Sequence, residues 1–211
     1  MKIERDQIEI ISGMRDGKTL GSPLGFLIKN RDWANWEKYM DPLKVQDDGK
    51  KITKPRPGHG DLSGALKYDF SDIRNVLERA SARETAARVA IGSIIKQFLN
   101  PFGIDVYSHV LSIGSVSIEA KADLEQIKKA DASPLRVVDE EAEGKMMEEI
   151  DKAKENGDSL GGIFEIQITG VPVGLGSHVH WDRKLDAQLA SSLMSIQGIK
   201  GVEIGMGFAN A

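Results

Sequence analysis

Between Lys54 and Tyr68 the chain reads KPRPGHGDLSGALKY, which sets Arg56 and His59 among glycines and prolines. Glycine has no side chain, so a glycine-rich backbone can approach a bound molecule closely. A guanidinium matches the geometry of a phosphate or carboxylate, and an imidazole exchanges protons near neutral pH. This loop therefore has the residue types of half a site for an anionic molecule, with His59 available for proton transfer.

A second segment, SARETAARVAIGSIIKQFL at residues 81–99, has apolar residues at helical spacing. Ser81 is followed three residues later by Glu84, the pattern of a capping box at the start of a helix. The free backbone N–H groups at such an end attract anions. We therefore expect a helix whose N-terminus lies near any anion that the first loop binds.

Arginines cluster around that helix start, at Arg79, Arg83 and Arg88. A positive charge in the first turn opposes the helix dipole, and a bound phosphate or carboxylate would account for its presence. The alternative is that these arginines form surface ion pairs with Glu78 and Glu84, since Glu84 and Arg88 have the i,i+4 spacing of such a pair. The residues alone leave both interpretations open.

A different chemistry is conceivable at HVHWD, where His178, His180 and Asp182 occupy alternate positions. In a strand these side chains would share one face, as metal ligands do, and would make the protein a metal-dependent hydrolase. The competing interpretation is a polar turn in which Asp182 caps a helix that starts near Lys184. We favour the turn and expect no metal site.

Hydrophobic periodicity predicts strands at residues 6–13, 24–30, 104–119 and 199–208, and a buried strand followed by a turn at residues 161–176; the strand at 104–119 is broken near Gly114. It predicts helices within residues 31–42, from Ser71 onward, and at residues 81–99, 121–130, 139–155 and 182–196. The order does not follow a strict βαβ rhythm. The predicted class is therefore α+β, with helices layered on sheets.

The composition excludes several classes of protein. The chain has 211 residues, no cysteine and a formal net charge of −4. Without cysteine there are no disulfides and no thiolate chemistry. The negative charge argues against a nucleic-acid surface, and no window approaches 18 consecutive apolar residues, so we expect neither nucleic acid nor membrane as a partner.

Five longer strings occur in the order in which one known family has them: TLGSPLGFLIKNRDW, RPGHGDLSGALKY, DIRNVLERASARETAARVA, GDSLGG and HWDRKLDAQLASSLMSIQGIKGVEIG. On these blocks the chain resembles chorismate synthase over nearly its whole length. The resemblance implies a single domain over residues 1–211, with the layered helix/sheet sandwich of that family incomplete at both ends.

The resemblance also implies a reaction. Chorismate synthases are lyases of the shikimate pathway, which leads to the aromatic amino acids. They remove phosphate and a ring hydrogen from 5-enolpyruvylshikimate 3-phosphate by anti-1,4 elimination, giving chorismate. They require reduced FMN although no net oxidation or reduction occurs. The family further implies a cytoplasmic homotetramer.

Five residues match the family's site. Arg56 would bind the anionic substrate, and His59 would lie beside the flavin as a catalytic proton donor. Ser81, Ala82 and Arg83 would line the flavin, and Ser81 and Arg83 would also contact the substrate.

Two further blocks of the family have no match in residues 1–211. One precedes the matched region and carries a second catalytic histidine, and the other follows it and carries a functional aspartate. We therefore expect little or no turnover from this chain by itself. The alternative function is that of a truncated or degenerate homologue without catalytic activity.

Overall fold

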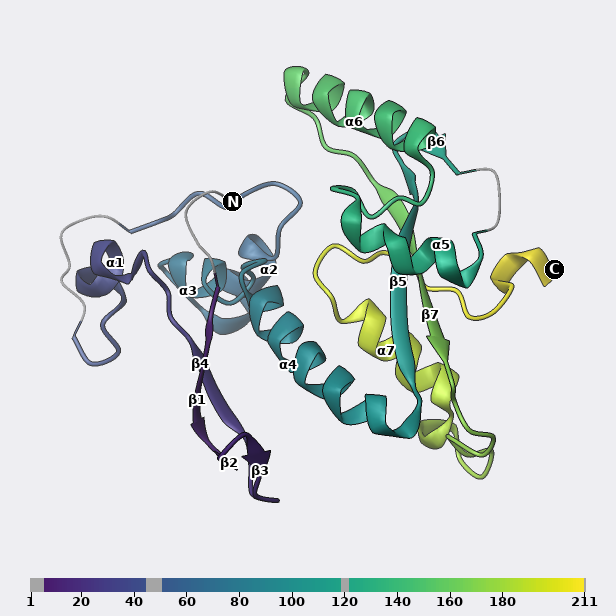
Figure 1. Cartoon of the computed structure of the whole chain (residues 1–211). Coiled ribbons are helices and arrows are strands. Elements are labelled where there is room, and N and C mark those ends of the chain that lie inside the picture. Colours follow the sequence, from purple (N-terminus) through teal and green to yellow (C-terminus); the bar gives the residue numbers. More distant parts are fainter. Residues whose placement is uncertain (1–5, 45–50, 119–121, 211) are drawn as a thin grey trace. The chain divides into compact units, whose positions relative to one another are not determined.

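The computed structural model describes residues 6–44, 51–118 and 122–210, and the chain divides into two compact units (Figure 1). Unit 1 comprises Met1–Ser93 and Gly176–Ala211, and unit 2 comprises Ile94–Leu175. Both units combine helices with antiparallel strands. The class is therefore α+β, as the sequence predicted.

Unit 1 begins with two small antiparallel sheets. Strand β1 (Ile8–Ser12) pairs with β4 (Gly25–Ile28), and β2 (Met14–Arg15) pairs with β3 (Lys18–Thr19). The β1–β4 pair confirms the strands predicted at residues 6–13 and 24–30. It also sets the position of Asp6, which lies just before β1 and belongs to the candidate site.

The helices of unit 1 include those predicted at residues 31–42, from Ser71 onward, at residues 81–99 and at residues 182–196, and one helix that was not predicted, within residues 54–68, which were expected to be a loop. They are α1 (Trp33–Met40), α2 (Asp61–Tyr68), α3 (Arg74–Leu77), the first part of α4 (Glu84–Leu99) and α7 (Leu185–Met194), together with the 3₁₀ turns η3 (Trp181–Arg183) and η4 (Gly207–Asn210). Helices α2 and α3 pack closely, because a Cβ at Gly64 would lie 2.6 Å from Cγ1 of Val76. This contact fixes the helix that follows the candidate loop.

The strand predicted at residues 199–208 is wrong. Residues 199–204 have no regular secondary structure, and η4 follows them. A strand is stable only where a neighbouring strand accepts and donates its backbone hydrogen bonds. Among the residues that the structure describes, no strand pairs with this segment.

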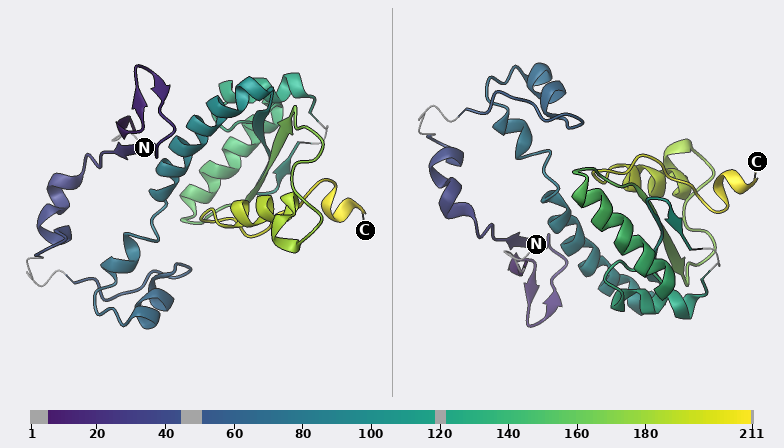
Figure 2. Two further views of the ribbon diagram at one scale, coloured as in Figure 1. Left: turned by 90° about the horizontal axis from the view of Figure 1, so that it is seen from below. Right: turned by 90° about the horizontal axis from the view of Figure 1, so that it is seen from above.

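Unit 2 is a three-stranded antiparallel sheet in the order β6-β5-β7, with two helices beside it (Figure 2). Its strands are β5 (Asp105–Ile113), β6 (Val116–Ser117) and β7 (Gly162–Thr169), and its helical elements are η1 (Asn100–Phe102), α5 (Leu124–Lys129), η2 (Ala130–Ala132) and α6 (Glu140–Glu155). Gly114, with φ of 58°, separates β5 from β6 and confirms the predicted break. Glu119 and Lys121, at the ends of two predicted elements, lie outside the described residues.

The core of unit 2 forms where α6 meets β5 and β6. Its buried members are Val137, Ala142 and Met146, and partly buried apolar side chains of the strands and of the segment before α6 pack against them. Asp139 caps α6 by accepting hydrogen bonds from the backbone of the first turn. The helix predicted at residues 139–155 is therefore confirmed, and its cap at Asp139 is an additional finding.

Strand β7 forms as predicted, but its predicted burial is wrong. Ile163 is 61% exposed, Phe164 43% and Ile168 40%. Apolar side chains of a strand are buried only where another layer covers them. In the described part of the chain no layer covers these three fully.

No helix in the described ranges is long and apolar enough to cross a bilayer.

Candidate functional site

The glycine-rich loop is closed by an ion pair between Arg56 and Asp61. The Asp61 carboxylate accepts hydrogen bonds from the Arg56 backbone N–H at 2.9 Å, from Nε at 2.9 Å and from Nη2 at 3.0 Å. Asp61 has a side-chain exposure of 0%, against 46% for Arg56. The hydrogen bond from the Arg56 guanidinium lowers the pKa of Asp61 to about 2, although burial acts in the opposite direction. Asp61 is therefore a buried anion neutralised by one arginine.

His59 lies within this closed loop. Its backbone N–H donates to the Arg56 carbonyl at 3.4 Å, and Gly58 before it has φ of 72°, a conformation that favours glycine. The imidazole Nδ1 lies 3.0 Å from the carbonyl oxygen of Pro57. A carbonyl oxygen can only accept, so Nδ1 carries the hydrogen and Nε2 has the lone pair of the neutral ring. Nε2 is thus the atom through which the exposed His59 can take up or give a proton.

The second segment has its own arginine–carboxylate pair. Arg83 holds the Asp6 carboxylate with Nη1 at 2.7 Å and Nη2 at 2.6 Å, and the Ser81 hydroxyl accepts a hydrogen bond from the Arg83 backbone at 3.2 Å. The hydrogen bond from Arg83 lowers the pKa of Asp6. The guanidinium therefore already binds a two-oxygen anion, here the carboxylate of Asp6.

The capping box predicted at Ser81 and Glu84 is wrong, because both side chains have other partners. The Ser81 hydroxyl binds the Arg83 N–H, and the Glu84 carboxylate accepts from Arg88 Nε at 3.0 and 3.1 Å and from Gln197 Nε2 at 2.6 Å. The hydrogen bond from Gln197, followed by that from Arg88, lowers the pKa of Glu84. The i,i+4 pair of Glu84 and Arg88 is confirmed.

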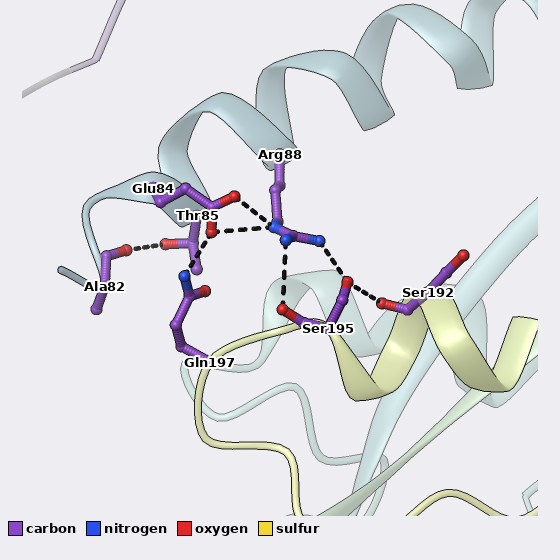
Figure 3. A network of polar contacts seen from close by, with 7 residues as sticks. All are labelled: Ala82, Glu84, Thr85, Arg88, Ser192, Ser195 and Gln197. Atoms are coloured by element: carbon purple, nitrogen blue, oxygen red, sulfur yellow. Dashed lines mark hydrogen bonds and ion pairs between the residues drawn. The ribbon is translucent and has the colours of Figure 1, made fainter. Parts of the chain in front are cut away.

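Figure 3 shows how this pair joins α4 to the end of α7. Arg88 donates from Nη1 to the Ser195 hydroxyl at 2.9 Å and from Nη2 to the Ser195 carbonyl at 3.3 Å. The Ser195 hydroxyl in turn donates to the Ser192 carbonyl at 2.6 Å. The network lies within unit 1 and fixes the turn that carries Ala82, whose carbonyl accepts from the Thr85 hydroxyl at 2.6 Å. Arg88 therefore supports the site and is not itself the anion-binding group.

The structure thus places the five predicted residues in two groups. Arg56 and His59 share the loop closed by Asp61, and Ser81, Ala82 and Arg83 form the turn before α4. Sequence reasoning missed Asp61 and Asp6, the two carboxylates that hold the arginines. An aspartate in the first turn of a helix is an ordinary choice, and Asp6 lies 77 residues from its partner, so neither offered a signal.

The alternative metal site is not supported. His180 Nδ1 lies 2.7 Å from Asp182 Oδ1. Within residues 6–44, 51–118 and 122–210, however, no group of three or more metal-ligating side chains is found. Asp182 does not cap α7 either, since Lys184 occupies the N-cap position without a side-chain hydrogen bond. The Asp182 carboxylate is occupied by His180 instead.

The donor set fits the anionic groups of a phosphorylated cofactor or substrate. Arg83 already binds a carboxylate through two nitrogens, and the Ser81 hydroxyl lies in the same turn. His59 adds a group that exchanges a proton. The fold and the site together define an α+β protein whose donor groups suit an anionic small molecule.

Comparison with known proteins identifies the family. The chorismate synthase family model matches residues 1–211, so the chain belongs to the chorismate synthase family. It is 65% identical to the chorismate synthase of Alkaliphilus metalliredigens (strain QYMF), with 100% of this chain and 56% of that protein covered. It is 56% identical to the chorismate synthase of Carboxydothermus hydrogenoformans, over 100% of this chain and 56% of that protein.

The fold agrees with this assignment. A crystal structure of chorismate synthase superposes on this chain with a TM-score of 0.81 at 46% sequence identity. The superposition covers 97% of this chain and 57% of the chain in the crystal structure. The present chain therefore spans little more than half the length of the relatives that it matches.

Proposed function

We propose that this chain carries part of a chorismate synthase active site. The reaction would be the anti-1,4 elimination of phosphate from 5-enolpyruvylshikimate 3-phosphate, in which a carbon–oxygen bond breaks, phosphate leaves and the ring loses a hydrogen to give chorismate. The observation that carries the proposal is the Arg83 guanidinium, which holds a carboxylate through both Nη atoms in the segment that the family model matches.

The residues divide the work according to their chemistry. Arg83, with Ser81 and Ala82 in the same turn, would bind phosphate or carboxylate groups of the flavin and the substrate. Arg56 would attract the substrate with the edge of the guanidinium that Asp61 does not occupy. His59 would transfer a proton at Nε2, because Nδ1 is engaged by Pro57. Reduced FMN, when bound, would supply electron density as phosphate leaves and accept the hydrogen.

The proposal includes a cytoplasmic homotetramer as the form of the complete enzyme. It also includes little or no turnover by residues 1–211 alone, since the chain spans 56% of its relatives. A homologue that folds without catalysing is the second candidate.

A hybrid enzyme separates these two candidates. The matched segment of the Alkaliphilus protein would be replaced by residues 1–211, and chorismate formation would be measured anaerobically with reduced FMN. We expect turnover close to that of the parent, because the segments are 65% identical. A folded hybrid that binds FMN without turnover would favour the degenerate homologue.

His59→Ala in the hybrid tests the assigned proton transfer. The loss of a positioned proton donor should lower kcat about 100-fold or more and change the flavin Kd only slightly. If flavin binding collapses while turnover per bound flavin stays normal, His59 is a cofactor contact only.

A further inference from the structure

Asp61 is unusual in being a charged residue that is completely buried. It is one of two polar side chains that the structure describes as buried, the other being His109 in unit 2. A buried carboxylate is costly unless it is paired and hydrogen-bonded. Both oxygens of Asp61 are engaged by Arg56, so Asp61 is not a group that contacts a ligand.

The pair acts on the backbone as well as on the side chains. Asp61 binds both the backbone N–H and the guanidinium of Arg56, which lies five residues earlier in the chain. Arg56 is therefore held at two points. On the other side of the loop, Gly60 accepts hydrogen bonds from the Ser63 hydroxyl at 3.1 Å and from the Gly64 N–H at 2.8 Å. The backbone around His59 is therefore anchored on both sides.

This anchoring determines which nitrogen of His59 is available. The ring can donate from Nδ1 to the Pro57 carbonyl only while the loop keeps that carbonyl within reach, at 3.0 Å. A released loop would let the exposed ring adopt the Nε2–H tautomer that unconstrained imidazole prefers in water. The neutral ring would then carry its hydrogen on Nε2 and could not recover at that atom the proton that it donates.

We propose that Asp61 is a positioning residue: by clamping Arg56 it fixes the loop in which His59 carries its hydrogen on Nδ1 and presents Nε2 for proton transfer. The use of that proton rests on the proposed function, but the control of the tautomer does not. Arg56 accordingly has a structural task in addition to any contact with substrate.

The test is the tautomer of His59 in the 211-residue chain, read from ¹⁵N–¹H correlation spectra at about pH 8, where an ordinary imidazole is neutral. The His59 signals would be assigned with His59→Gln. We expect the Nδ1–H form in the unsubstituted chain and a loss of that preference in Asp61→Asn. The amide keeps the shape of the carboxylate but has neither its charge nor its second acceptor oxygen.

Asp72→Asn is the matched control. Asp72 lies in the same unit and accepts the backbone N–H groups of Ile52 at 3.2 Å and Arg74 at 2.9 Å, so it anchors backbone without contacting Arg56. We expect this variant to keep the Nδ1–H form. A folded Asp61→Asn protein that keeps it too would overturn the proposal, as would an Asp72→Asn protein that loses it equally.

Arg56→Lys decides the question if Asp61→Asn does not fold. Lysine keeps a positive partner for Asp61 but replaces the fork of the guanidinium by a single point charge. Loss of the Nδ1–H preference in this variant supports the clamp, and its retention overturns it. In the hybrid enzyme, Asp61→Asn should lower kcat about 10-fold or more with a smaller change in KM. An inactive hybrid would contradict the proposed function and leave the tautomer result standing.

Discussion

Unit 1 contains two arginine–carboxylate pairs with similar geometry and different surroundings. Arg56 and Asp61 are five residues apart, and the carboxylate is completely buried although the Arg56 side chain is 46% exposed. Arg83 and Asp6 are 77 residues apart, with side chains 31% and 41% exposed. A pair whose carboxylate is buried is part of the fold, because removing the arginine leaves that charge unpaired, whereas a pair with an exposed carboxylate exchanges readily with water or with another ion.

This difference assigns different tasks to two arginines that are chemically identical. One edge of the Arg56 guanidinium binds Asp61 and so closes the loop. Arg56 cannot release Asp61 without disturbing the backbone. Arg83 can exchange the exposed Asp6 for a phosphate or carboxylate of a ligand. We therefore regard the Arg83 pair as the exchangeable pair and the Arg56 pair as the frame of the loop that carries His59.

The largest expected effect concerns Arg83. In the hybrid enzyme, Arg83→Ala should raise the substrate KM about 100-fold, because two charge-assisted hydrogen bonds to an anion are lost. Arg83→Lys should recover only part of this loss, since lysine offers no fork. Steady-state kinetics at saturating reduced FMN would measure both, and an unchanged KM in Arg83→Ala would show that the guanidinium does not bind substrate.

The next largest effect should be on thermal stability, which the two carboxylates should affect to different extents. Asp61→Asn should lower the Tm of the 211-residue chain by about 10 °C, because it removes the buried carboxylate that holds both the backbone and the guanidinium of Arg56. Asp6→Asn, at an exposed pair, should change Tm by no more than about 2 °C. Thermal unfolding followed by circular dichroism provides the comparison. Equal shifts for the two variants would remove the distinction between frame and exchangeable pair.

Acid should remove the stabilisation that Asp61 provides within a defined range of pH. The folded-state pKa of Asp61 is about 2 and its ordinary value is 3.8, so the unfolded chain takes up the proton first as the pH falls. The stabilisation is complete above the ordinary value and is lost as the pH falls through about 2. Urea unfolding between about pH 5 and pH 2 should therefore show a loss of stability that is smaller in Asp61→Asn. An identical pH dependence in the two proteins would contradict the assigned ionisation.

The smallest effect should appear in ligand binding at the exposed pair. Asp6→Asn removes the carboxylate that competes for Arg83, so the chain should bind inorganic phosphate about threefold more tightly. Isothermal titration calorimetry at low and high salt would show this, with the difference shrinking at about 1 M salt because exposed charges are screened. Weaker binding in Asp6→Asn would mean that Asp6 orients Arg83 and does not compete with the ligand.

The accuracy of the sequence predictions depended on how local each feature is. The pair of Glu84 and Arg88 was foreseen because one helical turn brings the two side chains together. The capping box failed because Gln197, 113 residues away, takes one of the acceptor positions of Glu84. The burial of β7 failed because it depends on a covering layer, and no pattern within a strand supplies one.

The sequence by itself therefore determined the family, most helices and strands, and the residue types of the site, since these depend on short-range spacing and on strings that recur in relatives. Only the tertiary structure decided how each arginine is used. The acid at position 61 is buried against Arg56, and the acid at position 6 reaches Arg83 across 77 residues. Burial and long-range approach arise when distant segments pack together, and they make one ion pair a fixed part of the fold and the other available for exchange.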